Sequence, residues 1–108
     1  MFKSIAQDYF GAFEKKDINK LRELLDSEVI LRDWNVEAIG LENVLNINME
    51  IFKAFEKIQV HVMSLYAEES TVIGELTIIL DDAVTMKVVD VIEFTGLRKI
   101  KSIRAYKG

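Results

Sequence analysis

The sequence contains no cysteine, which excludes a disulfide framework, a thiolate metal site and a cysteine nucleophile. Histidine is almost as scarce, because His61 is the only one, and a single histidine argues against a zinc site. The chain also lacks an apolar run of the roughly 18 residues that a membrane-spanning helix needs. Its net charge of −4 at pH 7 gives no support for nucleic-acid binding. We therefore expect no metal, no cofactor, no membrane association and no nucleic-acid partner.

The start of the chain lacks the features of a targeting signal. Polar Gln7 and Asp8 follow closely after Met1, so the apolar core of a signal peptide is missing. We expect a cytoplasmic protein on this ground. The 108 residues are enough for one hydrophobic core, and no repeat, low-complexity stretch or linker divides them. The sequence predicts a single domain over residues 1–108.

Three segments in the first half of the chain have the apolar spacing of amphipathic helices. The first spans residues 2–13, the second follows Asp17 as its N-cap, and the third begins at or just after Gly40. Between the last two, residues 27–33 predict a strand. The apolar positions that define the helices are Phe2, Ile5, Ala6, Tyr9 and Phe13; Ile18, Leu21, Leu24 and Leu25; and Val44, Ile47, Ile51, Phe52 and Phe55.

From Lys57 onward the apolar residues recur with a period of two, which is typical of strands. The pattern predicts strands over residues 57–68, 71–80, 83–95 and 98–107, and the short connections make them an antiparallel meander. Helices followed by a long antiparallel sheet indicate an α+β fold. We expect three N-terminal helices packed on one face of a curved, mainly antiparallel sheet.

The two faces of the segment 83–95 differ in character. One face is apolar except for Asp90, so we predict that it lies under the helices. The other face mixes Val89 and Val91 with Lys87 and Glu93. A half-apolar sheet face often packs on a second copy of itself, and we expect a homodimer through this face. An ordinary amphipathic outer face would have the same pattern.

Three polar residues occupy positions where the apolar pattern predicts an inward-facing side chain. Tyr9 is on the stripe of the first helix, Asp33 shares a strand face with Val29 and Leu31, and Asp90 is on the apolar strand face. A buried carboxyl is costly unless it is paired, hydrogen-bonded or neutral. These residues therefore indicate either an acid–base site in a pocket or carboxyl groups that local backbone and neighbours satisfy.

The two ends of the chain resemble a known superfamily. The segment from Tyr9 to Asp17, continuing to Leu24, resembles the usual opening of the nuclear transport factor 2-like superfamily, also called SnoaL-like. Residues 88–94, followed by Lys99 and Ile100, resemble its usual ending. The resemblance covers nearly the whole chain and implies a cystatin-like α+β cone with a pocket between helices and sheet. Enzymes and non-enzymes share these motifs, so they imply a fold more strongly than a function.

Within that superfamily the chain resembles ketosteroid isomerase most closely. That family has a tyrosine on the first helix, an aspartate base at the end of the first strand and a protonated aspartic acid on a late strand. Tyr9, Asp33 and Asp90 fall at the matching positions. The resemblance implies that Asp33 removes a proton next to a carbonyl while Tyr9 and Asp90 stabilise the enolate oxygen. Two positions depart from the family, since Trp34 replaces a proline and Asn48 replaces a supporting tyrosine.

The expected ligand is a small apolar molecule in the pocket. A SnoaL-like cyclase or dehydratase would use the same carboxyls in other roles. The alternative is a non-catalytic binding or dimerisation module, in which Tyr9 is a core residue, Asp33 bonds turn amides and Asp90 is structural. The residues that we expect to line the pocket, besides the three polar ones, are Phe13, Trp34, Asn48, Phe52, Met86, Val88 and Ile92.

Overall fold

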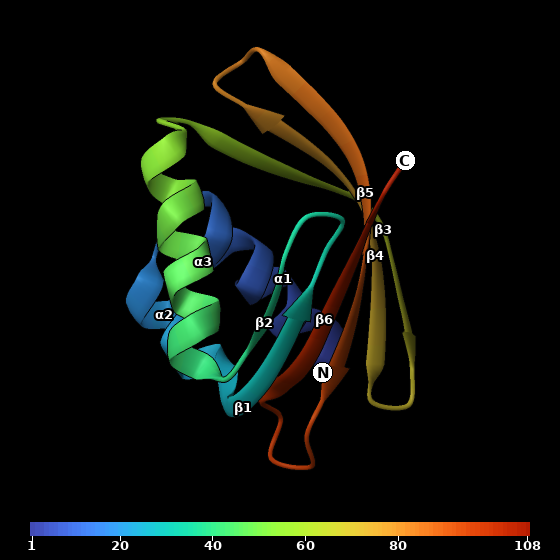
Figure 1. Cartoon of the computed structure of the whole chain (residues 1–108). Coiled ribbons are helices and arrows are strands. Elements are labelled where there is room, and N and C mark those ends of the chain that lie inside the picture. The colour runs from blue at the N-terminus through green and yellow to red at the C-terminus, as the bar shows by residue number, and fades with distance from the viewer.

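The computed structural model describes all residues from Met1 to Gly108. Two helices and two strands come first, then a third helix and four more strands (Figure 1). The helices are α1 (Phe2–Glu14), α2 (Ile18–Leu24) and α3 (Leu41–Ala54). The strands are β1 (Leu25–Arg32), β2 (Glu37–Ile39), β3 (Ile58–Glu68), β4 (Thr71–Leu80), β5 (Val84–Phe94) and β6 (Ile100–Lys107).

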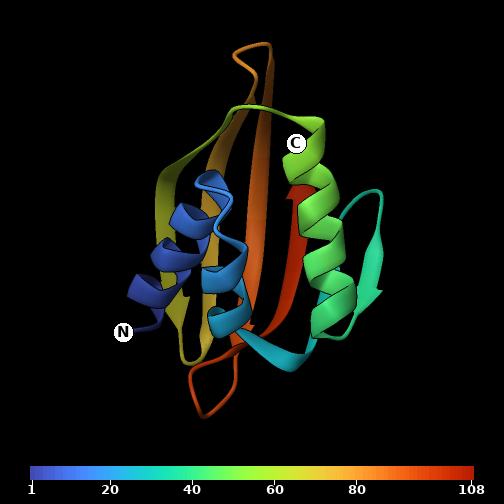
Figure 2. The ribbon, with the colours of Figure 1, turned by 90° about the vertical axis from the view of Figure 1, so that its left-hand side faces the viewer.

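All six strands form one sheet in the order β2-β1-β6-β5-β4-β3. Strands β3 to β6 pair antiparallel in chain order, which confirms the predicted meander. β1 differs because it runs parallel to β6, and β2 folds back antiparallel on β1. The three helices cover one face of this curved sheet (Figure 2). The predicted α+β fold class is therefore confirmed.

The helices are held by side chains that complete their ends. The Asp17 carboxylate accepts a hydrogen bond from the Lys20 N–H at 3.1 Å and so caps α2, as predicted. Lys16 Nζ donates to the carbonyl oxygens of Phe52 at 2.9 Å and Phe55 at 2.5 Å, at the C-terminal end of α3. This lysine therefore ties the α1–α2 connection to α3.

None of the helices has the combination of length and apolar character that crossing a membrane would require.

Some element boundaries differ from the predicted ones. Leu25 has extended backbone and begins β1, whereas the apolar spacing placed it on α2. β1 ends at Arg32, so Asp33, which the sequence placed at the end of the strand 27–33, lies in the following turn. The last strand begins at Ile100 rather than at 98, because the Thr95 hydroxyl accepts two backbone N–H groups and closes the preceding turn. The sequence did not predict β2, Glu37–Ile39, because three residues are too few to establish a period.

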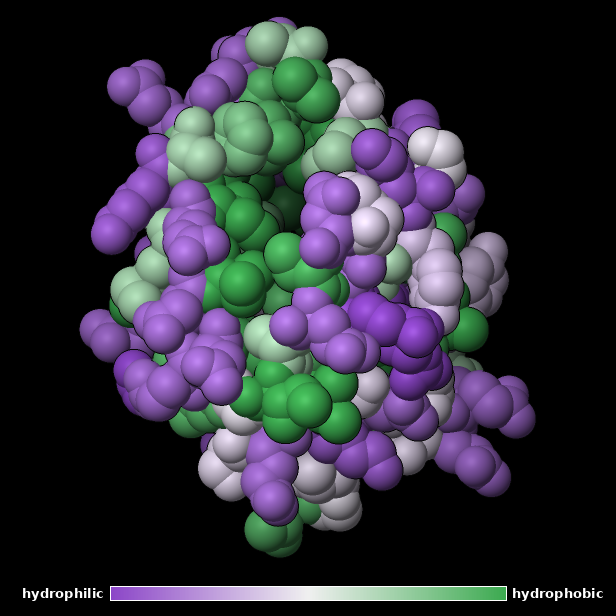
Figure 3. All heavy atoms as spheres, in the orientation of Figure 1, coloured by the Kyte–Doolittle hydropathy of each residue, from purple (hydrophilic) through white to green (hydrophobic).

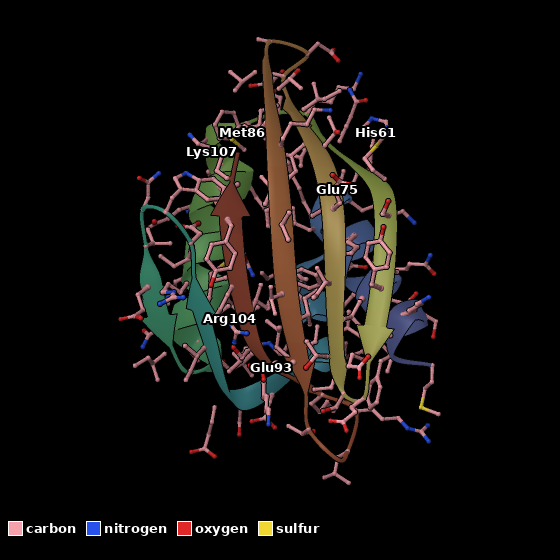
Figure 4. The ribbon with its side chains drawn as sticks, turned by 90° about the vertical axis from the view of Figure 1, so that its right-hand side faces the viewer. His61, Glu75, Met86, Glu93, Arg104 and Lys107 are labelled. Carbon is pink, nitrogen blue, oxygen red and sulfur yellow. The ribbon has the colours of Figure 1, made fainter.

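The two faces of β5 have the environments that the sequence predicted. Val88, Asp90, Ile92 and Phe94 are buried on the face that the helices cover. The opposite face of the sheet carries no helix, as Figure 4 shows with Glu75, Glu93 and Arg104 labelled on it. The homodimer through this face stays a prediction.

Candidate active site

A cavity of about 350 Å³ opens between the helices and the concave face of the sheet. Residues of α1, α3, the β1–β2 turn and strands β1 and β3 to β6 line it, and 17 of the 22 lining residues are hydrophobic. Figure 3 shows a hollow in the surface whose visible walls are mostly hydrophobic. Such a wall with a few polar groups is typical of a small-molecule site.

Tyr9, Asp33 and Asp90 all line this one cavity, although the first and the last are 81 positions apart in the sequence. Tyr9 comes from α1, Asp33 from the turn after β1, and Asp90 from the middle of β5. The fold therefore brings together the three residues that the sequence singled out.

Asp90 is only 8% exposed although its side chain is a carboxyl. Its neighbours in the sheet are the small residues Gly74 on β4 and Ala105 on β6, which leave room beside it. The Phe10 ring fills the space above Gly74, where an added Cβ would lie 3.1 Å from a ring carbon. Burial, and second the negative charge of Asp33, raise the pKa of Asp90 from 3.8 to about 7.

Tyr9 is 6% exposed and packs against other aromatic rings of α1. Its ring centroid lies 5.7 Å from that of Phe10 and 6.5 Å from that of Phe13. Burial, and second the charge of Asp90, raise the pKa of the Tyr9 phenol well above its ordinary value. The phenol therefore keeps its proton at every ordinary pH and is available as a hydrogen-bond donor.

The two oxygens of Asp33 have different environments. Oδ1 accepts hydrogen bonds from the backbone N–H groups of Asn35 at 2.7 Å and Val36 at 2.8 Å. The Asp33 N–H donates in turn to the Val36 carbonyl oxygen at 2.9 Å. Oδ2 has no hydrogen-bond partner in the protein. Asp33 thus closes a turn with one oxygen and keeps the other available to the cavity that the residue lines.

Five of the seven other predicted lining residues do line the cavity, and two do not. The five are Phe13, Trp34, Asn48, Met86 and Val88. Phe52 is a correction, because its ring packs against that of Phe13, with centroids 5.2 Å apart, at the end of α3. Ile92 is a second correction, because it lies on the correct face of β5 but is fully buried in the core.

The turn that follows Asp33 contributes more residues to the cavity than the sequence predicts. Asn35 and Val36 line the cavity together with Trp34, a residue that is 39% exposed. Lys107 Nζ lies 5.4 Å from the centroid of the Trp34 ring, within cation–π range. Trp34 is an expected lining residue, whereas the Asp-Trp-Asn sequence gives no sign that Asn35 and Val36 line the cavity as well.

Asn48 is the fourth polar residue inside the site. It lies on α3, is 2% exposed, and its Nδ2 makes no hydrogen bond with the protein. Because buried amide groups are nearly always paired, this atom is an exception that needs an explanation. It occupies the position where the isomerase resemblance places a tyrosine.

The arrangement has the parts that proton transfer next to a carbonyl requires. Such chemistry needs a base and hydrogen-bond donors for the developing enolate oxygen, and the cavity lining contains a carboxyl group with one unpaired oxygen (Asp33), a phenol (Tyr9) and a buried carboxyl group (Asp90). No group of three or more His, Cys, Asp or Glu side chains is arranged to hold a metal ion.

Comparison with known proteins places the chain in a family. The family model of the SnoaL-like domain matches residues 6–103, and no curated protein sequence matches the chain. A proposed SnoaL-like polyketide cyclase from Shewanella denitrificans is similar in structure, with a TM-score of 0.89 at 10% identity, covering 99% of this chain and 90% of that one.

Two further similar structures carry other activities in their names. A proposed ketosteroid isomerase from Kribbella flavida has a TM-score of 0.86 at 16% identity and covers 99% of this chain and 77% of that one. An LEH-like epoxide hydrolase from M. tuberculosis has a TM-score of 0.85 at 15% identity, covering 99% and 82%. Identities this low show a shared fold and do not transfer an activity.

Proposed function

Because the chain belongs to the SnoaL-like domain family, we propose that it is an enzyme that does acid–base chemistry without a cofactor on a small apolar carbonyl compound. The reaction is removal of a proton from the carbon next to the carbonyl group. The observation that carries this proposal is that one mainly apolar cavity is lined by Tyr9, Asp33 and Asp90.

Asp33 is the base in this proposal. Its Oδ1 is held by the N–H groups of Asn35 and Val36, so the carboxylate has a fixed orientation, and Oδ2 takes the proton. A positioned base typically accelerates a reaction by ~10²–10⁴-fold. Return of the same proton from Asp33 to another carbon of the enolate would complete an isomerisation.

Tyr9 and Asp90 stabilise the enolate oxygen. The Tyr9 phenol keeps its proton, and burial keeps a large share of Asp90 protonated up to a pH of about 7. Both groups then present an O–H to the same oxygen in a mainly apolar cavity. Loss of one such donor typically costs ~10²–10³-fold in rate.

A second function is favoured by one specific observation. The hydrogen bonds from the turn amides to Asp33 are those of an aspartate that only shapes a turn. On that ground the chain would be a binding module for a small apolar molecule, with no turnover. A cyclase or dehydratase of the SnoaL type is the nearby catalytic variant, with the same three residues in other roles.

The experiment that tests the proposal is isomerisation of two β,γ-unsaturated ketones, a ketosteroid and the smaller 3-cyclohexen-1-one. Both give conjugated products that absorb in the ultraviolet. The variants are Asp33→Asn, which keeps an oxygen for the turn amides but removes the base, and Asp33→Ala, which removes both. Glu75→Gln on the outer face of the sheet is the matched control (Figure 4).

We expect wild type and Glu75→Gln to convert at least one ketone equally fast, and Asp33→Asn to lose at least 10²-fold of that rate while it melts at the wild-type temperature. Equal rates for wild type and Asp33→Asn contradict the role of Asp33 as a base. No conversion above buffer, together with saturable binding of either ketone, supports the binding module instead.

A further inference from the structure

Asn48 Nδ2 is the one side-chain nitrogen or oxygen in the structure that has both almost no accessible surface and no hydrogen-bond partner. The residue lies on the buried face of α3, one turn after Val44 and Leu45, where an apolar residue is the ordinary choice. Leaving a buried N–H unpaired lowers the stability of the fold. A sequence that breaks the local pattern at such a cost commonly does so for function.

Asn48 also lines the cavity that holds Tyr9, Asp33 and Asp90. It comes from α3, which none of those three residues belongs to. Two further polar residues of the lining, Asn35 and Glu50, are exposed, so Asn48 is the buried polar group that the proposed proton transfer leaves unused. The N–H has no partner and almost no accessible surface where it lies, and a half-turn of the terminal amide, which exchanges its nitrogen and oxygen, presents it to a molecule in the cavity.

The number of donors decides which atom of a ligand Asn48 would contact. A carbonyl oxygen has two lone pairs, and the O–H groups of Tyr9 and Asp90 are enough to occupy both. A third donor requires a second acceptor. Because the cavity is otherwise mainly hydrophobic, that acceptor is an uncharged oxygen on an apolar skeleton.

We propose that Asn48 Nδ2 donates a hydrogen bond to a second oxygen of the ligand, and that the ligand class is an apolar carbonyl compound with a further ketone, ester or ether oxygen. This inference rests on the proposed function, because it takes Tyr9 and Asp90 as the donors to the first oxygen. Asn48 acts here as a residue that determines specificity and takes no part in proton transfer.

Two naphthols that differ in one atom test the proposal. 6-Acetyl-2-naphthol has a phenolic oxygen that mimics an enolate and an acetyl oxygen as second acceptor. 6-Isopropenyl-2-naphthol has nearly the same shape but a CH₂ group in place of that acetyl oxygen. Binding of each to wild type, Asn48→Leu and Asn48→Ala is measured by titration of naphthol fluorescence, and thermal melting of each protein is recorded without ligand.

We expect wild type to bind the acetyl compound at least tenfold more tightly than the isopropenyl compound, because a site built for a hydrogen bond discriminates against a ligand that lacks it. In Asn48→Leu the ratio falls to about one, the isopropenyl compound binds at least as well as before, and the melting temperature rises. If leucine does not fit, Asn48→Ala replaces it as the test variant because it only removes atoms. The ratio of the two affinities is again expected to fall to about one.

Equal affinities of wild type for the two naphthols overturn the assignment, as does a ratio that survives in both Asn48 variants. Failure of wild type to bind either compound also overturns it, since the acetyl compound belongs to the proposed class. Binding does not require the base, so the outcome is separable from turnover. Wild type could prefer the acetyl compound, with the Asn48 variants losing that preference, while Asp33→Asn has no effect on turnover. That result would reject the proton-transfer role of Asp33 and keep the contact at Asn48.

Discussion

Asp33 and Asp90 line the same cavity, and the charge of Asp33 adds to burial in raising the pKa of Asp90 to about 7. The two carboxyls thus differ in the role that their environments allow. Asp33 is partly accessible and bound by turn amides, whereas Asp90 is buried on an apolar strand face. Two acids with different environments can serve as base and as neutral donor within one site.

This relationship predicts how turnover depends on pH. The Asp90 donor is lost when its carboxyl ionises, so kcat/KM, which reports the ligand-free enzyme, should fall about tenfold per pH unit above a pH of about 7. Asp90→Asn keeps an N–H donor at the same place and cannot ionise. We expect its rate to be lower than the wild-type rate at pH 6 but free of this decline up to pH 9. A wild-type profile that stays flat from pH 6 to pH 9 would contradict the donor role of Asp90.

The same shift predicts a pH dependence of stability. The pKa of Asp90 is raised in the folded protein, so the folded state holds this proton more tightly than the unfolded state between pH values of about 4 and 7. The free energy of unfolding therefore decreases through that range, by about 4 kcal/mol for three pKa units, and levels off above it.

Asp90→Asn isolates this contribution, because the variant has no proton to lose. Relative to wild type, we expect it to be more stable by a few kcal/mol at pH 8 and nearly equal in stability at pH 4. Urea unfolding at the two pH values measures the difference. A stabilisation of the same size at both would mean that ionisation of Asp90 is not its cause.

Tyr9→Phe separates the chemistry of the phenol from its packing. The Tyr9 hydroxyl has no hydrogen-bond partner in the protein, while its ring packs against Phe10 and Phe13. We expect the variant to keep its melting temperature within a few degrees and to lose ~10²–10³-fold in kcat. Tyr66→Phe on exposed β3 is the control that changes neither. A Tyr9→Phe variant with full activity would leave Asp90 as the sole donor.

The sequence was informative about the site wherever a regular period fixed the direction of a side chain. The alternation along β5 places Asp90 under the helices, and the helical spacing of α1 places Tyr9 toward the sheet. The same periods cannot tell the cavity from the solid core. Ile92 shares its strand face with Asp90 but lies two residues further into the packed region, where the cavity does not reach.

The apolar pattern could not predict the position of the turn after β1 or whether the Asn48 amide on α3 has a hydrogen-bond partner. The position of Asp33 depends on β2, which is too short to have a period, and on two hydrogen bonds to the backbone. An asparagine on an apolar helix face predicts a buried amide. Whether that amide has a partner depends on side chains from other elements, which only the folded structure brings together.

The outer face of the sheet gives the last prediction, which concerns assembly. Ile73, Val89 and Tyr106 expose apolar surface at the centre of this face, and Arg104 Nη1 pairs with Glu93 Oε1 at 2.6 Å beside them. An apolar patch with charged residues at its side suits contact with a second copy of the same face. We expect a homodimer in solution, which light scattering coupled to size-exclusion chromatography measures.

Val89→Lys tests whether this face forms the dimer. Val89 is opposite Glu75 on β4, so a lysine there is accommodated in a single subunit but would be buried without water in a dimer. Val84→Lys is the matched control, because Val84 lies on the same strand, is also exposed and belongs to the opposite face. We expect Val89→Lys to elute as a folded monomer and Val84→Lys to remain dimeric. A wild-type monomer, or a dimer that both variants preserve, would contradict assembly through the outer face.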